Sequence, residues 1–173
     1  VVIKPWGYEF LVFGNELTAV WFLHIQPGHS TSMHCHPQKK TALVALAGRG
    51  LCNTFYNRNY LKAAEAIVLQ EGVFHATQAL SAEGLDLIEI ESPPEKSDLV
   101  RLEDQYGREG CGYEGLSEMR TEGLERFGWF NLVEPAPGAV QRHRHAAVDL
   151  AFFASSGPGR PAAAWKSVVY CSC

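Results

Sequence analysis

The sequence lacks the charge bias and the long apolar runs that mark several classes of protein. Its 173 residues carry a net charge of −4, with 15 lysines and arginines against 19 aspartates and glutamates, so no basic face is expected for nucleic acid or an anionic membrane. The longest apolar runs, such as Ala42–Ala47 and Leu150–Ala154, are far shorter than the roughly 18–20 residues that a membrane-spanning helix needs. An apolar content of 46% also argues against a disordered chain.

Cysteine is sparse and odd in number. The sequence has five cysteines with no zinc-finger spacing, whereas a secreted disulfide-bonded protein of this length usually has an even and denser set. The opening residues, Val1–Gly7, lack the charged and apolar regions of a secretory signal. We therefore expect a cytoplasmic protein with reduced thiols.

Short apolar segments separated by turn residues fill the first hundred positions. They occur at Glu9–Phe13, Leu17–Ile25, Thr41–Ala47, Leu51–Tyr56, Ala64–Leu69 and Leu85–Glu91. Many short strands at a spacing of roughly 8–12 residues, with Gly, Pro and Asn between them, favour an all-β sandwich or barrel.

The composition changes after Pro93-Pro94. We expect a β-barrel over residues 1–115 and a C-terminal extension over residues 116–173. The extension is predicted to contain a short amphipathic helix, a strand and a loop, at Leu116–Phe127, Trp129–Val133 and Ser155–Ala164.

Three histidines form the main candidate site. In a strand, residues i and i+2 point to the same face, so His34 and His36 would enter the same interior. His75 begins a later segment and could present its imidazole to the same point if that strand lies alongside. Neutral imidazole binds divalent zinc, iron, manganese or nickel, so we predict a metal site; hydrogen-bonded interior histidines are the alternative.

The spacing around these histidines resembles the two sequence motifs of the cupins. Gly28-x5-His34-x-His36-x4-Thr41-x6-Gly48 is similar to the first motif, and Glu71-Gly72-x2-His75 to the second. The resemblance implies a cupin double-stranded β-helix, or jelly roll.

Two further segments narrow the resemblance. Lys4–Glu9 (KPWGYE) and Asp98–Arg108 (DLVRLEDQYGR) are similar to the opening and closing segments of type II mannose-6-phosphate isomerases and their cupin relatives in sugar-nucleotide and surface-polysaccharide pathways. This implies a metal-dependent isomerase or epimerase acting on a sugar phosphate or nucleotide sugar. In such a reaction a bound metal orients and polarises the sugar oxygens.

The chain departs from the motif at one metal-ligand position, where Thr41 replaces glutamate and follows Lys39-Lys40. We therefore expect a three-histidine site, with Lys40, Thr41 and Thr77 as candidate substrate-binding residues and no identified catalytic base. A three-histidine dioxygenase and a non-catalytic sugar-binding cupin stay open as alternatives.

Three further groups of residues lie outside the candidate metal site. Arg101, Asp104 and Arg108 resemble closure residues of the family, but an ion-pair network on the outer surface of the barrel explains them equally well, so they are left out of the candidate site. His143 and His145 lie in a second HxH pattern, expected on a solvated polar loop. Because cupins commonly pair by exchanging an N-terminal strand, we predict a homodimer in which Glu9–Phe13 is exchanged.

Overall fold

The structure is a computed structural model. It describes residues 1–113, 124, 127, 135–136, 138–156 and 165–172. All of the regular elements in this part of the chain are strands, which confirms the all-β prediction. None of the described residues forms a helix long and apolar enough to cross a membrane.

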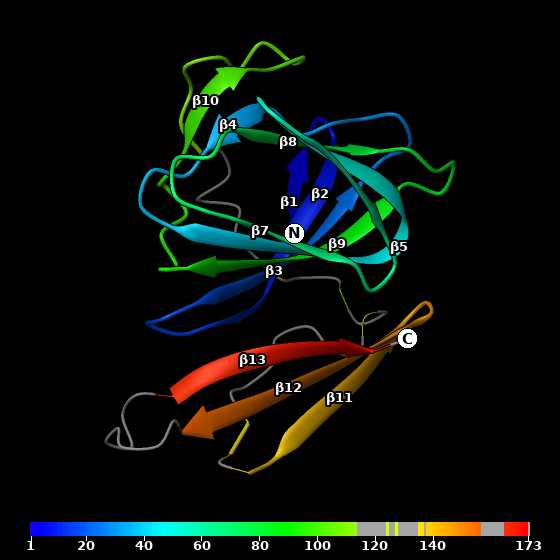
Figure 1. The fold of residues 1–173 in the computed structure, drawn as a ribbon, viewed down its shortest axis with the longest axis vertical. Helices are drawn as coiled ribbons and strands as arrows, with labels where there is room; N and C mark the ends of the chain where they lie inside the picture. The colour runs from blue at the N-terminus through cyan, green and yellow to red at the C-terminus, as the bar shows by residue number, and fades with distance from the viewer. Residues whose placement is uncertain (114–123, 125–126, 128–134, 137, 157–164, 173) are drawn as a thin grey trace.

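Ten strands form a strongly curled antiparallel sheet (Figure 1). They are β1 (Val2–Lys4), β2 (Gly7–Gly14), β3 (Ala19–Ile25), β4 (Met33–Cys35), β5 (Lys40–Thr54), β6 (Arg58–Lys62), β7 (Ala66–Leu69), β8 (His75–Ala79), β9 (Leu85–Ser92) and β10 (Val100–Glu103). Their order is β1-β2-β3-β9-β5-β8-β4-β10, and β6 and β7 also pair with β5. Strands distant in sequence therefore become neighbours around one interior.

The long strand β5 turns the corner of the barrel. Its first half pairs with β7 and β9, and its second half pairs with β6 and β8. The register with β9 shifts between Ala45 and Ala47. Gly48 follows with a φ of 79°, and a Cβ there would lie 2.1 Å from the Gly84 carbonyl oxygen. The motif glycine thus permits a close backbone approach where β5 bends.

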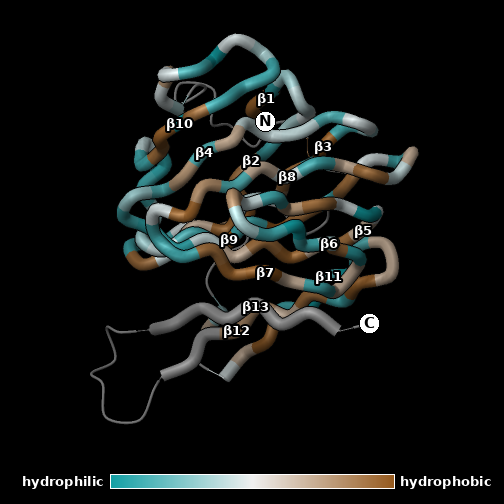
Figure 2. The backbone as a smooth tube through the Cα atoms, turned by 45° about the horizontal axis from the view of Figure 1, so that its top comes forward, coloured by the Kyte–Doolittle hydropathy of each residue, from teal (hydrophilic) through white to brown (hydrophobic). Residues whose placement is uncertain are grey.

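Apolar side chains cover both surfaces of the curled sheet. The interior core includes Trp21, Leu43 and Leu87. Phe22 and Ile88 belong to a second core on the outer surface. Figure 2 shows apolar stretches running through the barrel strands and hydrophilic stretches at many connecting loops.

A separate three-stranded sheet contributes to the outer core. It consists of β11 (Val140–His145), β12 (Val148–Ser156) and β13 (Trp165–Ser172), in that order, and it lies beside the barrel, near β3 (Figure 1). Val148, Leu150 and Phe152 of β12 are buried in the outer core. The extension therefore covers an apolar barrel face that would otherwise be exposed.

The structure modifies the expected makeup of the extension. Residues 155 and 156 of the predicted loop at Ser155–Ala164 belong to β12, and the rest of that loop lies outside the described residues. The second HxH pattern lies in strand β11, not on a loop. The predicted helix at Leu116–Phe127 lies outside the described residues except for Leu124 and Phe127, and the predicted strand at Trp129–Val133 and the domain boundary at 115–116 lie outside them entirely.

The segment predicted to be exchanged between subunits lies within β2. That strand pairs with β1 and β3 of the same chain. The homodimer stays a prediction.

Candidate functional site

The three motif histidines meet on the inner side of the barrel. His34 in β4 and His75 in β8 are direct antiparallel partners, and His36 follows β4. Their ring centroids are 4.4 Å apart for His34 and His75, 5.0 Å for His34 and His36, and 5.6 Å for His36 and His75. All three side chains line one cavity, so the structure brings together what the sequence pattern predicted.

Backbone carbonyls orient all three imidazoles in the same way. Nδ1 of His34 lies 2.8 Å from the Ser32 carbonyl oxygen, Nδ1 of His36 lies 2.6 Å from that of Asp98, and Nδ1 of His75 lies 3.0 Å from that of Val73. Because a carbonyl oxygen can only accept, each Nδ1 carries the proton and each Nε2 keeps its lone pair. This is the arrangement by which proteins prepare histidine as a metal ligand.

Burial keeps these histidines uncharged. It lowers the pKa of His34 well below the ordinary value, with a further lowering from His75. Burial, and then the nearby Lys39 ammonium, lower the pKa of His36 to about 4. The pKa of His75 is also lowered, mainly by burial. At neutral pH all three are therefore in the form that binds metal.

The residues present fit a divalent metal ion. One ligand atom from each of the three histidines lies within 4.8 Å of the others. The Nε2 atom of His36 is buried and has no hydrogen-bond partner, a costly arrangement unless a cation or a donor occupies the space in front of it. Three nitrogen ligands leave coordination positions open for other ligands.

Strand β9 brings two carboxylates to the same cavity. Glu89 and Glu91 are buried, and ligand atoms of both lie within 4.8 Å of each other and of one from His36. Lys39 Nζ lies 2.5 Å from Glu91 Oε1. Lys96 Nζ lies between 3.6 and 3.7 Å from oxygens of both glutamates.

Lys96 is surrounded by carboxylates and packs against an aromatic ring. Burial opposes its charge, but Glu9, Glu91 and Glu89 outweigh burial and raise the pKa of Lys96 above the ordinary value. Its ammonium also lies 4.0 Å from the centre of the Trp21 ring, a cation–π contact. Lys96 is therefore a fixed positive charge in the cavity wall.

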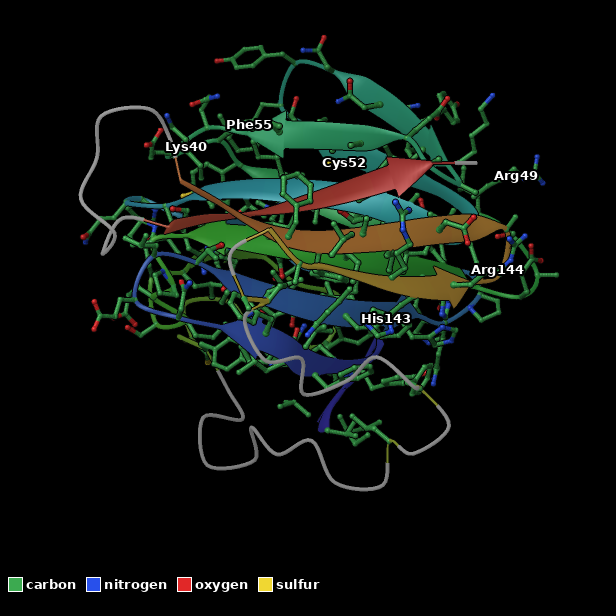
Figure 3. All side chains as sticks on the ribbon, turned by 90° about the horizontal axis from the view of Figure 1, so that it is seen from below. Lys40, Arg49, Cys52, Phe55, His143 and Arg144 are labelled. Carbon is green, nitrogen blue, oxygen red and sulfur yellow. The ribbon has the colours of Figure 1, made fainter. Side chains whose placement is uncertain are left out.

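The predicted substrate-binding residues separate into two groups. Thr77 is buried and lines the cavity. Thr41 is buried outside the cavity lining, and Lys40 is exposed, with Nζ 3.9 Å from Glu71. Lys40 lies toward the periphery of the molecule (Figure 3), and its neighbour Lys39 lines the cavity instead. A turn before β5 decides which lysine faces inward.

Arg101 and Arg108 of the closing segment were left out of the candidate site, and the structure corrects this. Arg101 is paired with His34 across β10 and β4, and both Arg101 and Arg108 line the cavity. Arg101 Nε donates to Ser32 Oγ at 3.1 Å. Arg108 forms hydrogen bonds to both carboxylate oxygens of Asp104 at 2.8 Å. The likeness of residues 98–108 to the closing segment of the resembled family could have indicated that these arginines belong to the site.

The opening segment also reaches the site, which the sequence interpretation missed. Lys4 and Glu9 line the cavity, and their charged atoms are 3.8 Å apart. The Tyr113 hydroxyl donates to Glu9. Burial and then Glu9 raise the pKa of Tyr113 above the ordinary value, so this phenol stays protonated.

The second HxH pattern does not join the site. His145 Nε2 lies 2.8 Å from Asp86 Oδ2, and His24 Nδ1 lies 2.6 Å from Asp86 Oδ1. Asp149 interacts with the exposed Arg144. In Figure 3 His143 and Arg144 lie on β11, in the sheet beside the barrel.

Comparison of the fold with solved structures places it among the double-stranded β-helices. A Klebsiella pneumoniae protein described as having a double-stranded β-helix domain is 18% identical, with a TM-score of 0.52, and the match covers 60% of this chain and 91% of that one. KdgF from Halomonas is 17% identical, with a TM-score of 0.51, over 54% of this chain and 85% of that one. The chain therefore has the cupin-type double-stranded β-helix fold predicted from its motifs.

Sequence comparison finds longer curated relatives. The mannose-1-phosphate guanylyltransferase ManC of Salmonella typhimurium is 30% identical over 109 residues, which are 62% of this chain and 23% of that protein. The mannose-1-phosphate guanylyltransferase of Escherichia coli is 27% identical over the same shares. The chain thus matches about a quarter of the length of these relatives. No protein-family model matches the chain.

Proposed function

We propose that this chain is a metal-dependent cupin acting on a sugar phosphate or nucleotide sugar, as an isomerase or epimerase. The observation that carries the proposal is the set of three neutral, buried imidazoles, each with Nδ1 tied to a backbone carbonyl and Nε2 left for a metal. Zinc, iron, manganese and nickel all suit such a donor set.

The charge of the cavity supports an anionic substrate. The described residues that line it include five cationic side chains and three carboxylates, and its histidines are neutral. A bound divalent ion would add to this positive balance, although the whole protein carries a net charge of −4. Such a cavity favours a negatively charged ligand such as a phosphate ester. The partial likeness to mannose-1-phosphate guanylyltransferases supports a sugar substrate.

The site residues suit a proton transfer between neighbouring sugar carbons. A divalent ion on His34, His36 and His75 would supply Lewis-acid polarisation of a substrate oxygen. Glu89 faces the cavity with a carboxylate that could take up and return a proton. Lys96 Nζ lies 3.7 Å from Oε2 of that carboxylate. Thr77 and Arg101 also line the cavity and would contact a substrate bound there.

Metal analysis of the purified protein tests the proposal. We expect about one transition-metal ion per chain in the wild type, none in a His34→Ala/His36→Ala variant, and an unchanged content in His29→Ala, since the His29 ring contacts the Pro27 carbonyl rather than the cavity. A metal-loaded protein should then interconvert mannose 6-phosphate and fructose 6-phosphate or epimerise a nucleotide sugar.

Two outcomes would replace this function with another. Iron in the wild type, together with oxygen consumption and no isomerase activity, would favour the dioxygenase. No metal after reloading, with retained binding of a sugar phosphate, would leave a non-catalytic sugar-binding cupin.

A further inference from the structure

A tyrosine that follows the last barrel strand reaches the cavity and has no part in the mechanism proposed above. Tyr113 is the only phenol among the described residues that line the cavity. Its hydroxyl donates to Glu9, whose side chain is buried and lines the same cavity. The phenol is therefore part of the cavity wall, although it comes from a segment outside the barrel strands.

The backbone that carries this tyrosine is fixed from inside the barrel. Arg101 in β10 is buried, and its Nη1 donates to the carbonyl oxygens of Arg108, Cys111 and Gly112 at 3.2, 3.0 and 3.2 Å. One guanidinium thus gathers the carbonyls of the segment that leads to Tyr113. These bonds hold the segment against the cavity.

Two ammonium groups fix the ring. Lys4 Nζ lies 4.0 Å and Lys96 Nζ lies 5.1 Å from the centre of the Tyr113 ring, which are cation–π distances. The same two nitrogens lie 3.8 and 3.6 Å from Glu9 Oε1, the oxygen that accepts the hydrogen bond from the phenol. The ring and its hydroxyl are therefore held in one orientation.

This orientation decides what the phenol can offer to a ligand. A tyrosine hydroxyl has one proton to donate and lone pairs with which to accept. Because the proton of Tyr113 is directed to Glu9, its oxygen can only accept a further hydrogen bond. A sugar hydroxyl is a donor and fits this requirement, whereas an oxygen of an ionised phosphate or carboxylate has no proton to donate.

We propose that Tyr113 is a specificity-determining residue that accepts a hydrogen bond from a ring hydroxyl of the sugar substrate. The inference rests on the proposed function and deepens it. It assigns the uncharged, hydroxyl-bearing part of the substrate to the end of the cavity formed by Lys4, Glu9 and Tyr113.

Calorimetric titration of the metal-loaded full chain with 1,5-anhydromannitol 6-phosphate tests the assignment. This probe has no carbonyl group, so it binds without being isomerised, and it keeps three ring hydroxyls. Tyr113→Phe should weaken binding by about threefold to tenfold, the usual effect of one lost hydrogen bond. Its metal content should stay that of the wild type, which shows that the variant is folded.

Tyr106→Phe is the matched control. The Tyr106 hydroxyl donates to the Ser30 carbonyl oxygen, and Tyr106 is not among the residues that line the cavity. This variant also loses one phenol hydroxyl, and it should bind the probe as the wild type does.

Deoxy probes separate a direct contact from a general loss of affinity. For one of the three probes that lack a single ring hydroxyl, the wild type should lose about the same factor that Tyr113→Phe loses with the parent probe. Tyr113→Phe should then bind the parent and that deoxy probe almost equally, because both changes remove the same hydrogen bond.

Two results would overturn the assignment. One is equal affinity of Tyr113→Phe and the wild type for the parent probe, and the other is a set of losses that multiply for all three deoxy probes. If the metal-loaded wild type binds no probe at all, the proposed sugar-phosphate substrate is overturned, and this inference with it.

Discussion

The inner and outer faces of the barrel differ in chemistry although the same strands build both. In β9, Glu89 and Glu91 face the cavity, whereas Ile88 is fully buried in the outer core with Phe22. A buried charge costs free energy unless it is paired, so the part of the interior near the histidines adds little net stability. The outer face, covered by β12, supplies apolar burial that can offset this cost.

The largest expected effect lies on the outer face. Phe22→Ala removes a fully buried ring that stacks on Phe10 at 4.9 Å, and we expect it to lower the free energy of unfolding by about 3–5 kcal/mol. Denaturant unfolding measures the loss, and Tyr56→Ala, at a 92% exposed position, should change stability by less than about 0.5 kcal/mol. Metal affinity of the folded Phe22 variant should match the wild type. If Phe22→Ala lowered the free energy of unfolding by less than about 1 kcal/mol, the outer face would not be the main source of stability.

A smaller effect is expected from breaking the inner ion pair. Lys39→Met leaves Glu91 without its 2.5 Å partner, and in the presence of a chelator we expect a loss of about 3 kcal/mol, because Lys96 stays 3.6 Å from Glu91 and limits the damage. The exposed neighbour provides a matched control, since Lys40→Met should cost less than about 0.5 kcal/mol.

A double variant separates the cost of an unpaired charge from the value of the pair. Lys39→Met/Glu91→Leu should recover most of the stability lost in Lys39→Met, because two apolar groups can replace a buried ion pair at little cost. If the double variant is as unstable as Lys39→Met, the ion pair itself stabilises the fold. The charged interior would then add more stability than we infer above.

Local spacing explains which parts of the site could be predicted. His34 and His36 share a face because they are two residues apart in a strand, and the glycines at 48 and 72 mark turns with positive φ. These relations depend on nearby residues alone, so the sequence predicted the three histidines and several of the strands. The segments Thr41–Ala47 and Leu51–Tyr56, expected as two strands, lie mostly in the single strand β5. Thr77, which shares the parity of His75, was found in the same way.

Long-range strand order explains what was missed. The alternation in Leu85–Glu91 shows that Glu89 and Glu91 share a face with Leu87, but it cannot show that β9 lies between β3 and β5. Arg101 reaches the cavity because β10 pairs with β4, more than 60 residues earlier in the chain. The alternation of side chains between the two faces holds only within one strand. A turn separates His36 from β5, so the alternation does not show that Lys39 rather than Lys40 faces inward.

The smallest expected effect lies where the extension contacts the barrel. Burial alone would raise the pKa of Asp86, but hydrogen bonds from His145 and then His24 outweigh it and lower that pKa below its ordinary value of 3.8. The carboxylate therefore stabilises the fold above about pH 3.8, and this contribution is lost as the pH falls through the lower folded-state pKa. Asp86→Asn should cost about 1–2 kcal/mol at pH 7, and its difference from the wild type should shrink in acid. Unfolding measured from pH 7 down to pH 3 in both proteins checks this, since groups that titrate equally in both cancel. A difference that stays constant with pH would show that the Asp86 charge does not help hold β11 to the barrel.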